Sequence, residues 1–340
     1  MSGTSLDGLD LALCRFLFVN GKWEYDILKC TTLPYDQTWK GKLKNAISLN
    51  GLQLAQLDIE FGGFIGRQAQ HFIRESGLMV KLISSHGHTI FHQPDNRLTV
   101  QIGNGAEIAA RANVPTVCDF RKKDVALGGQ GAPLVPVGDE LLFSQYNYCL
   151  NLGGFANVSF SHEGKRRAFD ICPVNIVLNE LAELDGLEYD QDGKLGRQGS
   201  INNDLLEKLN NLEYYTKSSP KSLGKEWLDT SFLPLLADSK INQNNVLRTI
   251  YEHFAQQIGH VLSPHRNVLV TGGGVYNKFL MERIRHCTTA KLIAPDDNLI
   301  QYKEALIFAL LGLLRWRGEI NCYGSVTGAT VDSCTGSVYL

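Results

Sequence analysis

Four glycine-rich turns, each placed where a β-strand is expected to end, constrain this chain more than any other feature. They read GTSLDG (Gly3–Gly8), SHGHT (Ser85–Thr89), NLGGFAN (Asn151–Asn157) and TGGG (Thr271–Gly274). Glycine lets backbone N–H groups approach an anion closely, and a helix that starts beyond such a turn favours negative charge. Several such turns, spread over two halves of a chain, predict a nucleotide polyphosphate held in a cleft between two domains.

The composition is that of an ordinary globular protein. The 340 residues are enough for two domains with a core each, and apolar residues make up 44% of them. Lysine and arginine number 33 against 35 aspartates and glutamates, which gives a net charge of −2. This balance argues against a general nucleic-acid or anionic-membrane binder.

The cysteines indicate a reducing compartment. The eight of them form no CxxC pair and no zinc-type spacing, and several stand in apolar, strand-like runs. Reduced, buried thiols of a cytoplasmic protein are therefore expected rather than a disulfide framework. No signal peptide is expected ahead of the first motif. The longest apolar run, Ala305–Leu314, is shorter than the roughly 20 residues of a membrane span, and a buried helix is expected there.

Patterning predicts strands alternating with helices in both halves. In the first half, a hairpin of Leu9–Phe18 and Lys22–Leu33 should turn at Asn20–Gly21. A βαβ unit with a parallel sheet is expected from Leu98–Ile102, Ala106–Ala112 and Thr116–Phe120.

The irregular segment GGQGAPLVP (Gly128–Pro136) is expected to be the crossing into a second domain. The predicted domains are thus residues 1–127 with the tail 316–340, and residues 128–315. The second domain opens with strands at Tyr148–Leu152, Val158–Phe160 and Arg167–Ile171, in an order like the start of the first half. An internal duplication is therefore inferred.

Two common nucleotide folds are not favoured. The phosphate-loop pattern GxxxxGK[ST] is absent, and TGGG lacks the third glycine of a dinucleotide fingerprint. The acetate/sugar kinase, heat-shock chaperone and actin superfamily binds phosphate in another way, with hairpin turns of two facing domains. The predicted fold is therefore α/β, a two-domain actin-like ATPase (ribonuclease H-like) fold.

A set of motifs makes the resemblance specific. The chain resembles the anhydro-N-acetylmuramic acid kinases over essentially its whole length, through MSGTSLDG (Met1–Gly8), SHGHT, QIGNGAEIA (Gln101–Ala109), DFRKKDVALGGQGAPLVP (Asp119–Pro136), NLGGFAN, PKSLGKEW (Pro220–Trp227), TGGGVYN (Thr271–Asn277) and KEALIFALLG (Lys303–Gly312).

The resemblance implies an ATP- and Mg²⁺-dependent sugar kinase of cell-wall (peptidoglycan) recycling, and a homodimer. That family opens the anhydro bridge of 1,6-anhydro-N-acetylmuramic acid with water while ATP phosphorylates O6. Opening the strained acetal requires a carboxylate base near the anomeric carbon. The freed O6 then needs a γ-phosphate steadied by backbone donors and a divalent ion.

Asp170 is the candidate base. The family motif at this place is approximately Asp-Thr-Gly-Pro-Gly-Asn, and this chain has Asp170-Ile171-Cys172-Pro173-Val174-Asn175. The bulkier Cys172 and Val174 stand at the glycine positions, where they would crowd a phosphate. The alternative for Asp170 is a cap on the helix that starts near Asn175.

Four further residues match family positions that contact the sugar. Glu304 is expected to bind the sugar, or to be an ordinary first-turn acid. Arg121 and Asp124 match positions near the lactyl carboxylate, for which arginine is suited, although Arg121–Lys123 could simply be a solvated basic face. His86 matches a histidine of the substrate cleft.

The nucleotide is expected at the glycine turns, through Gly3, Thr4, Ser5, Asp7, Gly8, Gly153, Gly154, Asn157, Gly272, Gly273 and Gly274. Asp7 is also the predicted Mg²⁺ ligand, through water, with a turn-stabilising Asp-Gly pair as the alternative. The spacing of His86, His88 and His92 raises the possibility of a metal site. Such a site is not favoured, because no nearby carboxylate or cysteine completes it.

Two other functions remain open from the sequence. A relative that binds a sugar or nucleotide as a sensor or interaction module fits the altered Asp170–Asn175 loop and Asn104, where the family usually has aspartate. An actin- or chaperone-like ATPase would hydrolyse ATP without sugar, and the resemblance over Gln101–Pro136 argues against it. No nucleic-acid or membrane partner is expected.

Overall fold

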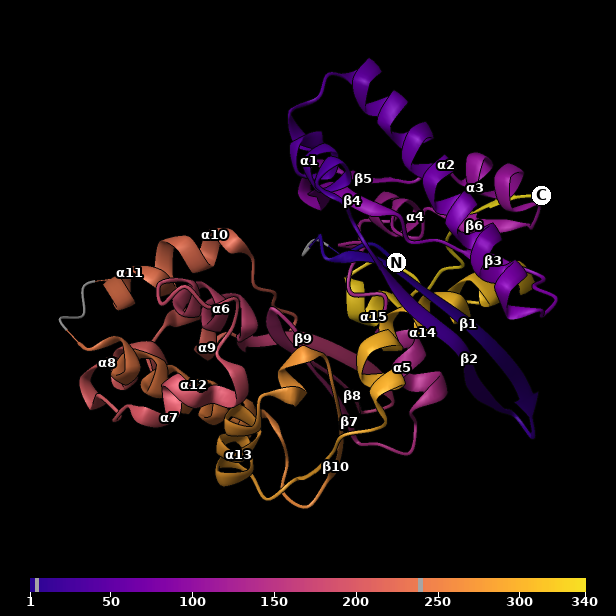
Figure 1. Ribbon diagram of the computed structural model, residues 1–340. Helices are drawn as coiled ribbons and strands as arrows, with labels where there is room; N and C mark the ends of the chain where they lie inside the picture. The colour runs from indigo at the N-terminus through magenta and orange to yellow at the C-terminus, as the bar shows by residue number, and fades with distance from the viewer. Residues whose placement is uncertain (4–5, 238–240) are drawn as a thin grey trace. The chain divides into compact units, whose positions relative to one another are not determined.

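The chain forms two compact units in a computed structural model that describes residues 1–3, 6–237 and 241–340 (Figure 1). The first unit is Met1–Leu142 with Tyr302–Leu340, and the second is Phe143–Gln301. The GGQGAPLVP segment belongs to the first unit, since the Gly131 N–H donates to the Asp124 carboxylate at 2.7 Å. The boundaries therefore lie at other residues than the sequence predicts, while the α/β class and the two-unit organisation are confirmed.

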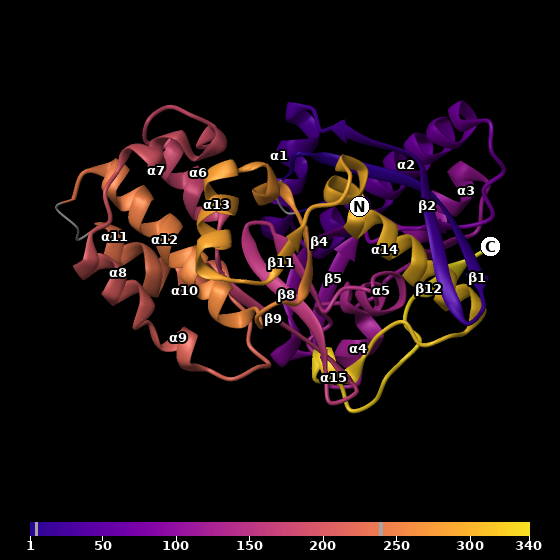
Figure 2. The same ribbon diagram turned by 90° about the horizontal axis from the view of Figure 1, so that it is seen from below.

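The strands of the first unit pair in three groups. The hairpin β1–β2 is antiparallel and turns at Asn20 and Gly21, whose φ angles of 49° and 78° are left-handed. In Figure 2 it is a long two-stranded ribbon. β6 pairs in parallel with β3 and antiparallel with β12, and β4 pairs antiparallel with β5. The bounds are β1 (Gly8–Val19), β2 (Lys22–Pro34), β3 (Ile83–Ser84), β4 (His88–Gln93), β5 (Leu98–Ile102), β6 (Thr116–Cys118) and β12 (Ser337–Tyr339).

The strand pairing predicted for the βαβ unit is wrong, although its first strand, Leu98–Ile102, is present as β5. β5 pairs with β4 and not with β6. The chain reverses between β4 and β5 at Pro94–Asn96, and Arg97 there adopts a left-handed φ of 55°. The parallel pair of this unit is β3 with β6. Proline, aspartate and asparagine in succession are a turn signal that the βαβ interpretation overlooked.

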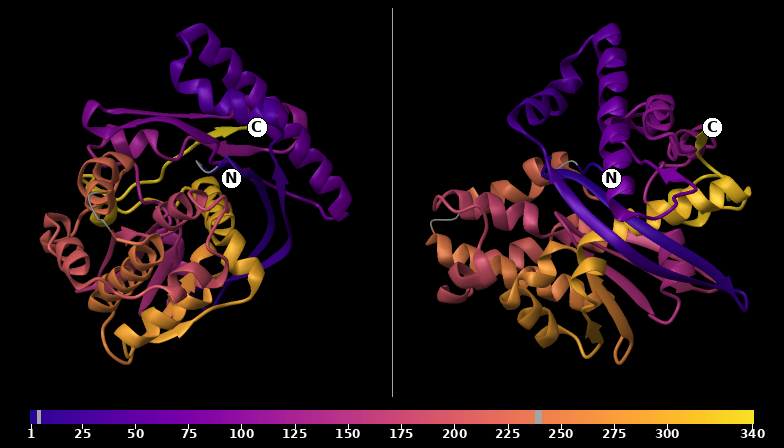
Figure 3. Two further views of the ribbon diagram at one scale, coloured as in Figure 1. Left: turned by 60° about the vertical axis from the view of Figure 1, so that its left-hand side comes forward. Right: turned by 45° about the vertical axis from the view of Figure 1, so that its right-hand side comes forward.

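Helices pack beside these strands. α2 begins with a capping box between Asn50 and Gln53, and it contacts α3 through glycines. A Cβ added to Gly62 would lie 2.6 Å from the Asn104 carbonyl oxygen, so the close approach requires glycine. In Figure 3, α2 is the long violet helix. The helices are α1 (Gln37–Asn45), α2 (Gly51–Ser76), α3 (Gly105–Ala112), α4 (Lys122–Ala126), α5 (Pro136–Leu142) and α15 (Gly324–Thr327), together with most of α14 (Asp297–Arg317).

The second unit is built on one mixed sheet of order β11-β10-β7-β8-β9. β7, β8 and β9 form an antiparallel meander, and β10 and β11 continue the sheet in parallel with β7. A three-strand meander followed by two parallel strands is the ribonuclease H-like topology that the sequence predicts. The bounds are β7 (Tyr148–Leu152), β8 (Phe155–His162), β9 (Lys165–Pro173), β10 (Asn267–Thr271) and β11 (Lys291–Ile293).

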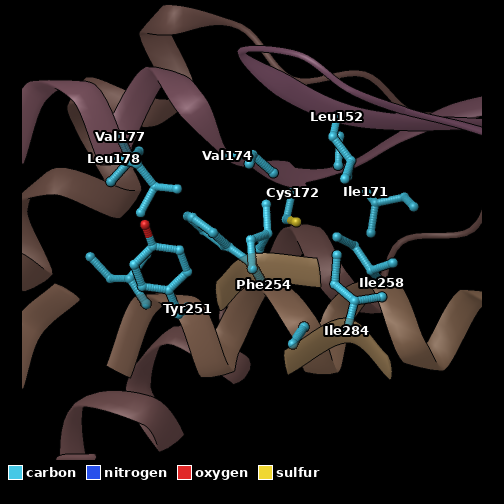
Figure 4. Close-up of a cluster of buried hydrophobic side chains, with 14 of the residues drawn as sticks. Leu152, Ile171, Cys172, Val174, Val177, Leu178, Tyr251, Phe254, Ile258 and Ile284 are labelled. Atoms are coloured by element: carbon cyan, nitrogen blue, oxygen red, sulfur yellow. The ribbon is translucent and has the colours of Figure 1, made fainter. Parts of the chain in front are cut away.

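The core of this unit joins the sheet to α12. One apolar face of α12 is buried, including Ile250, Phe254 and Ile258. These side chains meet residues of β7 and β9 (Figure 4). The helices of the unit are α6 (Asn175–Glu183), α7 (Lys194–Gln198), α8 (Asn203–Asn210), α9 (Glu213–Thr216), α10 (Lys225–Trp227), α11 (Leu233–Ala237), α12 (Gln243–Val261) and α13 (Lys278–Cys287).

The apolar run Ala305–Leu314 lies within α14, and Leu306, Phe308 and Leu310 are buried there as predicted. Over the described ranges, none of the helices has both the length and the apolar character needed to cross a membrane.

Candidate functional site

Two of the predicted nucleotide turns lie together in the second unit. Gly153 and Gly154 connect β7 to β8, and Gly272 follows β10, the strand beside β7. Asn175, the first residue of α6, is bonded to the β7–β8 turn: its Nδ2 donates to the Leu152 carbonyl at 3.2 Å, and its backbone N–H donates to the Gly153 carbonyl at 3.2 Å. Its side chain also lies next to Gly273 and Gly274 of the TGGG turn. The hairpin turn is thus tied to the start of a helix.

The TGGG turn requires glycine because its backbone packs closely on Asn151 and Leu152 at the end of β7. Gly272 has a φ of +87°, and a Cβ on it would lie 2.6 Å from Asn151 Oδ1 and 2.8 Å from the Leu152 carbonyl oxygen. A Cβ on Gly274 would lie 2.7 Å from Leu152 Cβ. No L-residue with a side chain fits these two positions without moving the neighbouring turn.

A β-bulge follows Asp170 in β9. In the β8–β9 ladder, Asn157 pairs with Asp170 and Ala156 pairs with Cys172, so Ile171 is an extra residue between the two pairs. Ile171 and Cys172 are both buried in the core, which regular alternation along a strand would not permit. Phe169, which pairs with the buried Val158, also packs against the core, so alternation along the strand turns Asp170 away from the core, and the bulge brings Cys172 onto the core face.

The Asp170 carboxylate is held at one oxygen. Oδ2 accepts a hydrogen bond from the Leu223 N–H at 2.9 Å, and among the described residues no protein group is bonded to Oδ1. Burial raises the pKa of this carboxyl, and the Leu223 hydrogen bond opposes the rise. α6 begins after Val174 with no side-chain cap from the residues described. The alternative in which Asp170 caps that helix is therefore wrong.

Cys172 and Val174 do not project toward the glycine turns. Both side chains are fully buried in the core cluster, and in Figure 4 they lie among Leu152, Ile171 and Phe254. The backbone at Val174 still serves the turn, because its N–H donates to the Gly154 carbonyl at 2.8 Å. The expected crowding of a phosphate by these two side chains does not occur in this unit.

In the first unit, Arg121 and His86 form a pair. Arg121 Nε and Nη2 lie 3.1 and 2.7 Å from His86 Nε2, and Nη1 donates to the Gly131 carbonyl at 2.6 Å. Burial and the Arg121 charge hold the pKa of His86 well below its usual range. No carboxylate of the described residues forms an ion pair with Arg121, so its charge is available to an anionic group of a ligand. The alternative of a solvated basic face does not describe it.

Asp124 lies inside the loop that carries Gly131. It has no exposed surface. Its Oδ2 accepts from the Gly131 N–H, and its Oδ1 accepts from Thr327 Oγ1 at 2.8 Å and from Cys322 Sγ at 3.0 Å. A direct contact with a ligand would require these bonds to break. The structure gives Asp124 a role in fixing this loop, which the sequence did not reveal, and its contact with the sugar stays a prediction.

Glu304 stands on α14 in the field of Arg121. Desolvation raises the pKa of the Glu304 carboxyl, and the positive charge of Arg121 opposes that rise. The preceding residue, Lys303, forms a buried ion pair with Asp139 of α5, with Nζ 2.7 Å from Oδ1. That pair fixes this turn of α14.

The first glycine turn is described in part. Thr4 and Ser5 lie outside the described residues. Gly3 and Asp7 are exposed, and a Cβ on Gly8 would collide with the Leu33 carbonyl oxygen. The histidine run diverges: His86 pairs with Arg121, while His88 Nδ1 lies 3.0 Å from Ser2 Oγ and His92 Nδ1 3.1 Å from Thr99 Oγ1. Within the described ranges no group of three or more His, Cys, Asp or Glu residues is placed to hold a metal ion.

Comparison with known proteins decides the family. The family model of anhydro-N-acetylmuramic acid kinase matches residues 1–340. The chain belongs to this family. The anhydro-N-acetylmuramic acid kinase of Sulfurimonas denitrificans is 34% identical over 364 residues, covering 100% of this chain and 98% of that protein. Those of Vibrio cholerae and Bacillus cereus are 33% and 31% identical, covering 100% and 99% of this chain and 96% and 97% of theirs.

This member of the anhydro-N-acetylmuramic acid kinase family is a sugar kinase. Its structure adds three groups that the sequence analysis did not select: the Leu223 N–H on Asp170, Asn175 between the two glycine turns, and Thr327 on Asp124. Asn175 retains the last residue of the family's Asp-to-Asn motif, and Leu223 lies in PKSLGKEW, so two of the three were within reach of the motif comparison.

Proposed function

We propose that the protein converts 1,6-anhydro-N-acetylmuramic acid, ATP and water into N-acetylmuramic acid 6-phosphate and ADP. The observation that carries this is the Asp170 carboxylate, turned away from the core, held at Oδ2 by a backbone N–H, and with Oδ1 unbonded among the described residues. Because burial raises its pKa, this carboxylate is a stronger base than an exposed aspartate.

The reaction balances through one water molecule. Asp170 takes a proton from the water as the water oxygen bonds to C1 of the sugar. The C1–O6 bond breaks and its electron pair stays on O6. O6 then bonds to the γ-phosphorus as the bond from that phosphorus to the bridging oxygen of ADP breaks. Strain in the bicyclic acetal makes O6 a good leaving group from C1.

The nucleotide site would use the two glycine turns of the second unit. We assign the phosphates to the backbone of Gly153 and Gly154 with Asn157, and the nucleoside to Gly272–Gly274. Support comes from the way Asn175 and α6 hold these turns, since a helix N-terminus beside a glycine hairpin favours anions. In the first unit, Gly3, Thr4, Ser5 and Gly8 are assigned to the phosphates as well.

Mg²⁺ would enter with ATP. The absence of a ready-made cluster of ligands among the described residues suits an ion that keeps several waters and binds mainly to phosphates, and Asp7 offers one exposed carboxylate. The ion would neutralise phosphate charge during transfer.

The sugar would be held by Arg121 and Glu304 in the first unit. Arg121 suits the lactyl carboxylate because its guanidinium lacks an acidic partner among the described residues and is oriented by His86 and Gly131. We assign Glu304 to a sugar hydroxyl, and His86 and Asp124 to positioning.

A cytoplasmic homodimer acting in peptidoglycan recycling completes the proposal. The eight cysteines are free thiols, which suits a reducing compartment. Light scattering of the purified protein tests the dimer.

A coupled assay of ADP formation with Mg-ATP, with and without the anhydro sugar, tests the activity. In H₂¹⁸O the label is expected at C1 of the product and not in phosphate. Asp170→Asn should abolish turnover and retain nucleotide binding, whereas the exposed Asp229→Asn should match the wild type. ADP release without sugar, or label in phosphate, would point to a simple ATPase. Tight sugar binding without turnover would point to a sensor, although the core position of Cys172 and Val174 removes one reason to expect it.

A further inference from the structure

The segment of residues 217–224, between α9 and α10, runs beside β9 at Asp170. β9 ends the order of the sheet, so its outer edge is available for such a segment. The Asp170 N–H donates to the Lys221 carbonyl at 3.3 Å, and the Leu223 N–H donates to Asp170 Oδ2 at 2.9 Å. We name residues 217–224 the β9 strap. The strap thus forms hydrogen bonds with both the backbone and the side chain of Asp170.

The strap is itself anchored at Tyr214. The Tyr214 hydroxyl donates to the Asp170 carbonyl at 2.5 Å. Lys221 Nζ donates to the Tyr214 carbonyl at 3.2 Å and stands 4.7 Å from the centre of the Tyr214 ring and 5.7 Å from that of Phe169. The cation is thus held by a carbonyl and two rings, with no ion pair to Asp170.

We propose that the β9 strap is the positioning element of the catalytic base: the Leu223 N–H fixes Asp170 Oδ2, so that Oδ1 alone is presented to the attacking water. This inference rests on the proposed function of Asp170 as base. Leu223 and Tyr214 act through Asp170 and are positioning residues.

A backbone donor is suited to this task. It favours the ionised carboxylate without adding a positive charge, so the carboxylate is oriented while it remains a base. The titratable groups that face Asp170 are Tyr214 and Lys221 beside it and Cys172 on its own strand. Burial raises the pKa of both Tyr214 and Cys172, so both are neutral at pH 7. Burial lowers the pKa of Lys221.

The test compares Leu223→Pro, which removes the N–H, with Leu223→Ala, which keeps it. The ionisation of Asp170 is followed by ¹³C NMR of protein labelled at aspartate carboxyl carbons, with the resonance assigned by its loss in Asp170→Asn. The midpoint should be higher in Leu223→Pro than in Leu223→Ala by about one pH unit, as expected for loss of a hydrogen bond to a charged group. The acidic limb of kcat/KM should move in the same direction.

Equal midpoints in two folded variants would overturn the proposal. If Leu223→Pro does not fold, the Leu223 amide of the wild type provides the second measurement. Its ¹H shift should titrate with Asp170, and its hydrogen exchange should be faster in Asp170→Ala. An amide that neither titrates nor changes its protection would also overturn it. Both NMR readouts are independent of turnover, so a protein without kinase activity would contradict the proposed function and leave this test intact.

Discussion

Two nitrogens of Arg121 share one acceptor on His86: Nε and Nη2 of the guanidinium lie 3.1 and 2.7 Å from the same imidazole nitrogen, Nε2. A nitrogen that accepts from both carries no proton, so the proton of the neutral ring is on Nδ1, beside the Gly87 carbonyl at 3.3 Å. The low pKa of His86 keeps this arrangement throughout the neutral range. The histidine thus fixes the direction of a guanidinium that has no acidic partner among the described residues.

His86→Ala should weaken sugar binding more than it slows the chemistry. Without its acceptor, Arg121 loses two of the contacts that orient it, and the loss of hydrogen bonds to a charged group costs about 1.5–3 kcal/mol. KM for the sugar should rise about tenfold or more, with a smaller change in kcat. Steady-state kinetics with varied sugar measure both. The exposed His71→Ala is the control. An unchanged KM in His86→Ala would mean that His86 does not position Arg121 for the sugar.

Asp124→Ala should destabilise the protein and impair the sugar site together. It leaves the Gly131 N–H, the Thr327 hydroxyl and the Cys322 thiol without their acceptor in a buried place. Unsatisfied buried donors cost about 1–3 kcal/mol each, so a loss of about 3 kcal/mol in unfolding free energy is expected.

Denaturant unfolding and sugar KM are measured for Asp124→Ala, with the exposed Asp95→Ala as control. Asp124→Asn should fall between them, because its amide oxygen can still accept from Thr327 while its NH₂ would face the Gly131 N–H. A stable Asp124→Ala with raised KM would instead support the direct contact with sugar that the sequence predicts.

Gly272→Ala should reduce both stability and nucleotide affinity. The left-handed φ alone costs about 1–3 kcal/mol for a residue with a side chain, and the new Cβ would press on Asn151 and the Leu152 carbonyl. Gly41→Ala, in α1 and with open space at the Cβ, is the matched control and should be neutral or slightly stabilising. Thermal unfolding and titration with ATP measure the two effects. An unchanged affinity for ATP in a folded Gly272→Ala variant would mean that the TGGG turn does not contact the nucleotide.

The sequence was sufficient for what depends on local patterning. The Asn20–Gly21 turn of β1–β2, the strand before TGGG and the buried helix at Ala305–Leu314 are all found where they were expected. The glycine turns were informative because a left-handed φ and close backbone contact, as at Gly272, leave little choice of residue.

The features that were missed depend on contacts between distant segments. The bulge at Ile171 arises from the register of β8 on β9, which no local pattern specifies, and it sends Ile171 and Cys172 into the core together. For that reason the sequence interpretation of Cys172 as an obstacle to phosphate was wrong. The role of Asp124 in fixing its loop was likewise missed, because its partners Cys322 and Thr327 come from the far end of the chain.

Asp170→Asn should stabilise the protein at neutral pH while it removes activity. Burial places the folded-state pKa of Asp170 above the value of about 3.9 in the unfolded chain. Between these two values the unfolded state has lost the proton and the folded state still binds it, so the wild type loses stability as pH rises through that window. Above the folded-state pKa the full penalty for the buried charge is present.

Asparagine keeps an acceptor for the Leu223 N–H and carries no charge, so it avoids this penalty. The thermal midpoint of Asp170→Asn should therefore exceed that of the wild type at pH 7.5, and the difference should shrink toward pH 4.5. Asp229→Asn controls for loss of an exposed charge. A variant less stable than the wild type at pH 7.5 would mean that the Asp170 carboxylate contributes to folding, which a carboxylate kept available as a base for catalysis should not do.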